Sequence, residues 1–90
     1  MNMVKTKVTI TNSLGMHARP AMAFVDAASA FSSNIKVIKD GQDVDGKSIM
    51  HLMMLAATKG TELEIIAEGD DAEEAIESLK DLVDRKFDEE

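Results

Sequence analysis

One stretch of the chain combines residue types that can bind and transfer a phosphoryl group. It reads Leu14-Gly15-Met16-His17-Ala18-Arg19-Pro20-Ala21. Pro20 fits only near the first turn of a helix, where a missing backbone N–H leaves no hydrogen bond unmade. This places His17 at about the N-cap, with the backbone N–H groups of Ala18 and Arg19 unpaired at the helix end.

Three properties of this helix end favour phosphate chemistry. Its partial positive charge and its free N–H groups bind anions, phosphate above all. The guanidinium of Arg19 can donate two hydrogen bonds to phosphoryl oxygens. The neutral imidazole of His17 is a nucleophile near neutral pH. The ordinary alternative is that His17 only caps the helix or sits in a turn and that Arg19 only adds solubility, and the spacing alone leaves both interpretations open.

A second candidate region begins at Ser48, which precedes a short and almost wholly apolar segment, residues 49–57. Serine is a favoured N-cap residue, so Ser48 is expected to start a helix there. Three methionines, Met50, Met53 and Met54, lie either in the core or in an exposed docking patch, since a helix apolar on every side cannot bury all of them. His51 is expected on the helix surface, because a metal site needs three or four ligands and the chain has two His and no Cys.

Length and composition limit the class of protein. Ninety residues fit one domain, taken as residues 1–90, with no room for a separate catalytic domain. The absence of cysteine excludes disulfides and thiolate nucleophiles, and three Phe without Trp or Tyr argue against stacking on single-stranded nucleic acid. The longest apolar run, residues 52–57, is too short for a membrane span. With no hydrophobic leader visible, we expect a cytoplasmic protein.

The charge is distributed unevenly. The chain carries −7 in total, made of +3 over residues 1–60 and −10 over residues 61–90. The basic part is too weakly charged for a nucleic-acid partner. Such an acidic segment is typical of a solvated helix face and a solubilising tail. We therefore expect the functional site to lie outside the last third of the chain.

Apolar periodicity predicts the elements that position these residues. Alternation of apolar and polar residues predicts strands at residues 4–10 and 63–67 and a hairpin over residues 35–44. Asp40-Gly41 is a two-residue hairpin turn, which places Val37 opposite Val44.

Helical spacing of apolar residues predicts helices at residues 18–31, 49–57 and 72–87. Lys59-Gly60 is expected to close the second helix, and Asp71 with Glu74 to open the third as a capping box. The order β-α-β-β-α-β-α predicts an α+β open-faced β-sandwich, a four-stranded antiparallel sheet with three helices on one face.

Two separated motifs carry a family resemblance. The stretch Leu14–Ala21 resembles the active-site signature of the histidine-containing phosphocarrier (HPr) family of the phosphoenolpyruvate-dependent phosphotransferase system. Gly46-Lys47-Ser48-Ile49-Met50, followed by Leu55-Ala56-Ala57 and Lys59-Gly60, resembles its second signature. Length and element order agree over essentially the whole chain.

The resemblance implies a carrier that is itself phosphorylated rather than an enzyme. His17 would accept a phosphoryl group on Nδ1 from enzyme I and pass it to an enzyme IIA domain, without a metal or organic cofactor. Arg19 and the backbone of Ala18 and Arg19 would hold the phosphoryl group. Ser48 would be the regulatory site of an HPr serine kinase/phosphorylase. The docking patch would consist of Met22, Ile49, Met50 and Met53. We expect a monomer with no nucleic-acid partner and no membrane insertion.

Two features of the resemblance point to different branches of the family. Asp26 and Ser29 stand where many members carry lysines, and residues 87–90 resemble the nitrogen-related branch, whose carriers regulate other proteins without driving sugar uptake. The intact Lys47-Ser48-Ile49 favours the branch controlled by a serine kinase, and this branch is preferred here. The alternatives are a nitrogen-type regulatory carrier and a non-catalytic interaction module in which His17 is only a cap.

Overall fold

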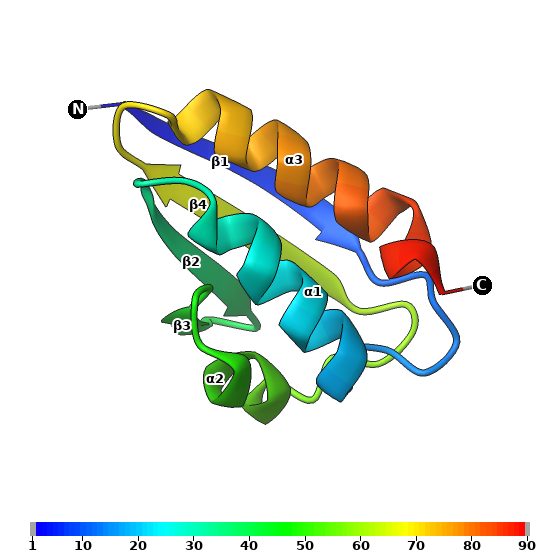
Figure 1. Cartoon of the computed structure of the whole chain (residues 1–90). Helices are drawn as coiled ribbons and strands as arrows, with labels where there is room; N and C mark the ends of the chain where they lie inside the picture. The colour runs from blue at the N-terminus through cyan, green and yellow to red at the C-terminus, as the bar shows by residue number, and fades with distance from the viewer. Residues whose placement is uncertain (1, 90) are drawn as a thin grey trace.

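Strands and helices follow one another along the chain in the order that the apolar periodicity predicts. The computed structural model describes residues 2–89 (Figure 1). Its elements are β1 (Met3–Thr9), α1 (Ala18–Ser29), β2 (Asn34–Lys39), β3 (Gln42–Asp45), α2 (Ile49–Met54), β4 (Glu62–Glu68), α3 (Ala72–Asp84) and the short 3₁₀ helix η1 (Lys86–Asp88). Within residues 2–89, no helix is both long and apolar enough to cross a membrane.

The four strands form one antiparallel sheet in the order β1-β4-β2-β3. The predicted hairpin is confirmed, because Val37 pairs with Val44 across β2 and β3. Asp40 and Gly41 between these strands have φ values of 50° and 82°, as a tight two-residue turn requires. The sequence order and the open four-stranded sheet therefore agree with the predicted fold class.

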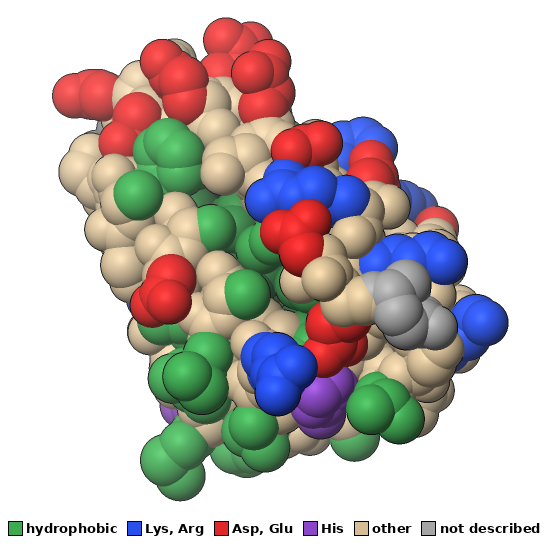
Figure 2. Space-filling model, turned by 45° about the vertical axis from the view of Figure 1, so that its right-hand side comes forward, with side chains coloured by type: hydrophobic (Ala, Val, Ile, Leu, Met, Phe, Trp, Pro, Cys, Tyr) green, Lys and Arg blue, Asp and Glu red, His purple; other side chains and the backbone are tan. Residues whose placement is uncertain are grey.

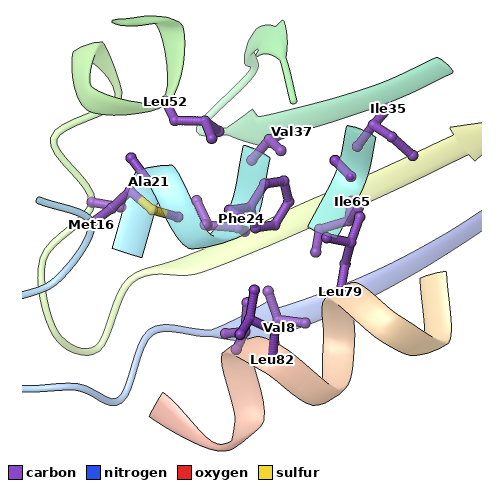
Figure 3. Close-up of a cluster of buried hydrophobic side chains, with 14 of the residues drawn as sticks. Val8, Met16, Ala21, Phe24, Ile35, Val37, Leu52, Ile65, Leu79 and Leu82 are labelled. Atoms are coloured by element: carbon purple, nitrogen blue, oxygen red, sulfur yellow. The ribbon is translucent and has the colours of Figure 1, made fainter. Parts of the chain in front are cut away.

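The helices cover one face of the sheet, and the core lies between the two layers. Helices α1 and α3 lie side by side across the sheet, and α2 packs beside α1 and β3 (Figure 1). Phe24 of α1 is fully buried and points toward side chains of the sheet (Figure 3). The other labelled side chains of this buried cluster are Val8, Met16, Ala21, Ile35, Val37, Leu52, Ile65, Leu79 and Leu82. Because every layer contributes to this cluster, the position of α1 on the sheet is fixed by packing.

The second helix is shorter than the periodicity predicts. It ends at Met54 instead of residue 57, and Lys59-Gly60 lies beyond its end. The N–H groups of Leu55 and Ala56 bond three residues back, and Ala56 then turns into the left-handed region with φ 51°. The physical reason is tertiary: the chain leaves the helix so that the buried Ala57 can contact the loop before α1.

The predicted capping box at the start of α3 is wrong. Asp71 is the N-cap residue, but its side chain makes no capping hydrogen bond. Its carboxylate accepts hydrogen bonds from the backbone N–H groups of Ser32 (2.9 Å) and Ser33 (3.0 Å), in the connection between α1 and β2. The N–H groups of Ser32 and Ser33 thus take the place of the first N–H groups of α3 as donors to Asp71. This contact joins the α1–β2 connection to the β4–α3 connection.

Candidate functional site

His17 lies at the start of α1, where the sequence predicts it. Its backbone is extended, with φ −88° and ψ −168°, and its carbonyl oxygen accepts the first helical hydrogen bond from the N–H of Ala21 at 3.0 Å. The imidazole makes no capping hydrogen bond. The interpretation of His17 as a side-chain cap is therefore wrong, and the ring is directed elsewhere.

The loop before His17 is held by backbone contacts. Met16 is buried, and its N–H donates to the carbonyl oxygen of Ala57 at 2.8 Å. Gly15 has φ +72°, and a Cβ atom there would lie 2.4 Å from the same carbonyl oxygen. Only glycine fits this close approach without displacing the backbone. The glycine of the motif therefore sets how His17 enters the helix.

The imidazole of His17 contacts a carboxylate from the end of the described chain. Its Nε2 lies 3.0 Å from Oε2 of Glu89. Oε1 of Glu89 accepts a hydrogen bond from Nδ2 of Asn12 at 3.0 Å, and the buried Asn12 also donates to the carbonyl oxygen of Gly15 at 2.8 Å. The expectation that the acidic last third contributes nothing to the site is wrong. No spacing signal links Glu89 to a histidine 72 positions away.

This contact orients the ring. A carboxylate only accepts hydrogen bonds, so Nε2–H of His17 is the donor. In a neutral imidazole with its proton on Nε2, the lone pair is on Nδ1. Nδ1 has no hydrogen bond to another residue in the described part of the chain. The nitrogen that remains open is thus the nucleophilic one.

Arg19, two residues after His17, and the helix end provide positive charge at the start of α1. Arg19 is exposed, and within residues 2–89 its guanidinium forms no ion pair or hydrogen bond. The N–H groups of Ala18 and Arg19 belong to the first turn of α1, where the helix offers them no acceptor. Figure 2 shows a histidine between a basic and an acidic side chain, with hydrophobic side chains around it. The arrangement can bind an anionic group at an exposed nucleophile.

The region around Ser48 takes the predicted form. Ser48 is the N-cap of α2, and its Oγ accepts a hydrogen bond from the N–H of His51 at 3.2 Å. The side chains of α2 differ in exposure. Met50 is 76% and Met53 is 44% exposed, whereas Leu52 is fully buried. The core alternative is therefore wrong for these two methionines, and the docking patch stays a prediction. Other exposed apolar side chains are Ile49 and Met54 of α2, Met22 of α1 and Leu14 of the loop before His17. Leu14 was not among the residues expected in the docking patch.

Comparisons with known proteins agree with this geometry. A family model described as the PTS HPr component phosphorylation site matches residues 4–85. The phosphocarrier protein HPr of Neisseria meningitidis serogroup B is 47% identical over 85 residues, which cover 94% of this chain and 96% of that protein. The crystal structure of HPr-C-His from Thermoanaerobacter tengcongensis has a TM-score of 0.93 at 49% identity and covers 97% of this chain and 98% of that one.

A crystal structure of an HPr dimer from Thermoanaerobacter tengcongensis is also similar, with a TM-score of 0.78 and 51% identity over 91% of this chain and 94% of that one. That relative forms a dimer in its crystal structure, and our expectation of a monomer for this chain stays a prediction. The family match spans nearly all of the sequence, and the sheet with its three helices matches the solved structures. The chain therefore belongs to the HPr family of phosphocarrier proteins of the phosphotransferase system.

Proposed function

We propose that this protein carries a phosphoryl group on Nδ1 of His17, receives it from enzyme I and passes it to an enzyme IIA domain. One observation carries the proposal. Nε2 of His17 is engaged by Glu89 while Nδ1 is open at the positive end of α1. A nucleophile with its lone pair exposed beside an anion-binding helix end is what phosphoryl transfer needs.

In the transfer step, the Nδ1 lone pair attacks the phosphorus atom of the donor. A new N–P bond forms, the bond from phosphorus to the donor's leaving atom breaks, and the leaving atom keeps the electron pair. The Nε2 proton stays on His17, so the ring becomes a phosphorylated imidazolium. Arg19 and the N–H groups of the first turn donate to the phosphoryl oxygens and offset their charge in the transition state. The reverse step delivers the group to the acceptor.

Every group in this step belongs to the chain or to its protein partner, so the proposal includes no metal or organic cofactor. The protein is altered in each transfer and restored only by the next one, which makes it a carrier and not an enzyme. It would act as a single domain and as a monomer in the cytoplasm.

The exposed apolar side chains provide the surface on which partners would dock. Met22 of α1 is 51% exposed and Ile49 of α2 is 38% exposed, and the two helices pack together. Exposed apolar side chains grouped in this way mark interaction surfaces more often than unused surface. We assign Met22, Ile49, Met50 and Met53 to the docking patch for enzyme I and enzyme IIA.

Ser48 is proposed as the regulatory site. Its hydroxyl already lies outside the end of α2, so a phosphate on that oxygen would leave the core untouched. A phosphate adds a charge of about −2 at neutral pH, next to the exposed side chains of Ile49 and Met50. It would repel a partner with an acidic docking surface. The Lys47-Ser48-Ile49 motif supports this serine-regulated branch over the nitrogen-type alternative.

The test is incubation with phosphoenolpyruvate and enzyme I, followed by intact-mass measurement. We expect one phosphoryl group per chain, stable in alkali and lost in mild acid. The His17→Ala variant should remain unlabelled, and the matched control His51→Ala should be labelled like the parent protein. Acid-stable phosphate, or full labelling of His17→Ala, would contradict the proposal.

The acceptor is identified in a second experiment with the labelled protein. Sugar-type and nitrogen-type enzyme IIA domains are added one at a time, and the loss of label from the carrier is followed with time. Rapid transfer to a sugar-type domain supports the preferred branch. Transfer to a nitrogen-type domain alone would assign the regulatory branch.

A further inference from the structure

We propose that Glu89 is a positioning residue for His17, which fixes Nδ1 as the open nitrogen and balances the charge of the phosphorylated ring. The inference rests on the proposed function of His17. It gives a defined role to a carboxylate in the acidic last third of the chain, whose other charges were expected only to solubilise it.

The contact is well placed for this role. Oε2 of Glu89 lies 3.0 Å from Nε2 of His17, and the two side chains are 16% and 36% exposed. The second oxygen of Glu89 is held by the buried Asn12, at 3.0 Å. A carboxylate held at both oxygens and partly shielded from water is ordered before the ring acquires charge. An exposed surface pair, in contrast, must order itself and contributes little.

The backbone that delivers Glu89 is conformationally strained. Helix α3 ends at Asp84, and three consecutive non-glycine residues then adopt left-handed φ values: 60° for Lys86, 56° for Phe87 and 60° for Asp88. Each such residue costs about 1–2 kcal/mol relative to the right-handed region. Strain of this kind persists only when the surroundings impose it, and it gathers at functional sites.

Two contacts fix this turn. The side chain of Phe87 is buried in the core, and η1 packs against α1, the helix that begins at His17. Nε of Arg85 donates to Oδ1 of Asp88 at 3.0 Å. The turn therefore reverses the chain after α3 and places the next side chain, that of Glu89, against the imidazole.

The carboxylate acts before and after transfer. Before transfer it accepts a hydrogen bond from Nε2–H of His17, and the neutral ring with this proton on Nε2 has its lone pair on Nδ1. After transfer the ring is a phosphorylated imidazolium that still holds the Nε2 proton, and the hydrogen bond to Glu89 becomes charge-assisted and stronger. Glu89 thus stabilises the phosphorylated form relative to the free form.

Competition for one phosphoryl group measures this preference directly. The fully labelled parent protein is mixed with an equal amount of an unlabelled variant and a trace of enzyme I, which exchanges the group between them. Intact mass then gives the share that each chain holds at equilibrium. The variants are Glu89→Gln, which keeps an acceptor oxygen without the charge, and Glu89→Ala, which removes both. Glu77→Gln is the matched control, since it makes the same substitution at an exposed glutamate of α3, away from the turn.

For Glu89→Gln we expect an exchange constant of about 5 in favour of the parent, the size of an ion-pair contribution. With equal amounts of the two chains, the parent then holds about twofold more phosphoryl than Glu89→Gln, and still more than Glu89→Ala. Glu77→Gln should share the group equally with the parent. Equal sharing by both Glu89 variants would overturn the inference. If the parent itself is not labelled on His17, the proposed function fails instead, so the two failures are distinguishable.

A spectroscopic measurement separates positioning from a general structural role. The imidazole ¹⁵N resonances of His17 report which nitrogen carries the proton. In Glu89→Gln we expect these resonances to shift while the melting temperature and the backbone amide resonances of the sheet stay unchanged. Unchanged imidazole resonances in that variant would contradict the positioning role.

Discussion

The backbone N–H of Met16 donates to the carbonyl oxygen of Ala57 at 2.8 Å, which joins the loop before His17 to the loop after α2. The same oxygen lies closest to the position that a Cβ atom on Gly15 would occupy. The carbonyl group of Ala57 thus sets both the conformation of the loop before His17 and the residue type that fits at position 15.

The first prediction follows for Gly15→Ala. The new Cβ would lie 2.4 Å from a backbone oxygen at φ +72°, so we expect the free energy of unfolding to fall by about 3 kcal/mol or more. Urea denaturation measures this. The control is Gly41→Ala, where φ is +82° but no atom lies within 4 Å, and only about 1–2 kcal/mol should be lost. Equal losses in the two variants would contradict the steric argument.

The second prediction concerns acid stability and Asp71. Hydrogen bonds from the Ser33 hydroxyl first, and then from the Ser32 and Ser33 amides, lower the pKa of Asp71 from 3.8 to about 2. A depressed carboxyl pKa stabilises the fold above the unfolded-state value, and this stability is lost as pH falls from about 4 to about 2. The slope of stability against pH in that window should decrease in Asp71→Asn, whereas the exposed neighbour Asp70→Asn should keep it. Chemical denaturation at several pH values measures this slope in both variants, and equal slopes would contradict the assignment to Asp71.

The third prediction concerns Arg19. Because its guanidinium has no ion-pair partner within residues 2–89, Arg19→Ala should hardly change the melting temperature. Transfer from enzyme I should slow by about tenfold, equivalent to ~1.4 kcal/mol of transition-state stabilisation. Arg19→Lys keeps the charge but not the two-pronged geometry, and should recover only part of the rate. Unchanged transfer kinetics in Arg19→Ala would leave the side chain with a solubilising role alone.

The fourth prediction separates the docking patch from the core. Met50 is 76% exposed, so Met50→Glu should weaken binding to enzyme I while the domain stays folded. The buried neighbour Leu52 provides the contrast: Leu52→Ala should lose about 2–5 kcal/mol of stability. Calorimetric titration and thermal unfolding measure the two effects. A Met50→Glu variant that unfolds, or that binds enzyme I normally, would remove Met50 from the patch.

The fifth prediction is a charge effect at Ser48. Ser48→Asp should slow phosphorylation of His17 more than Ser48→Ala does, because only the aspartate repels an acidic partner. Both variants should stay folded, with Ser48→Ala losing about 1 kcal/mol as its cap is removed. Added salt should narrow the difference in rate, since exposed charges are screened. Equal transfer rates in the two variants would leave Ser48 as a helix cap and nothing more.

Features with a local physical cause could be predicted from the sequence. The Asp40-Gly41 turn fixed the register of Val37 with Val44, because a two-residue loop allows only one pairing. Ser48 was predictable as a cap because its hydroxyl bonds to an N–H three residues away. Pro20 placed His17 at the helix start for a similarly local reason.

Features that depend on distant contacts could not be predicted. Ala56 ends α2 early because Ala57 is needed by the loop before His17. Asp71 bonds to serines of another connection instead of its own helix. Glu89 reaches His17 through the left-handed residues Lys86, Phe87 and Asp88, of which only Asp88 is a common turn residue, so the sequence carries no clear signal for this reversal. In each case the deciding partner lies far away along the chain.

The central position of β4 also decides when the site can form during folding. The β2–β3 hairpin closes through a two-residue turn, but β1 pairs only with β4, which joins Met3 to Glu68. Closing so long a loop has a high entropic cost, so this pairing is expected late. The loops that Met16 and Ala57 connect follow β1 and precede β4, and they meet only once those strands have paired. A chain that has formed the β2–β3 hairpin but not the β1–β4 pairing would therefore lack the completed site. In it, His17 would not yet have the start of α1 and the carboxylate of Glu89 in place.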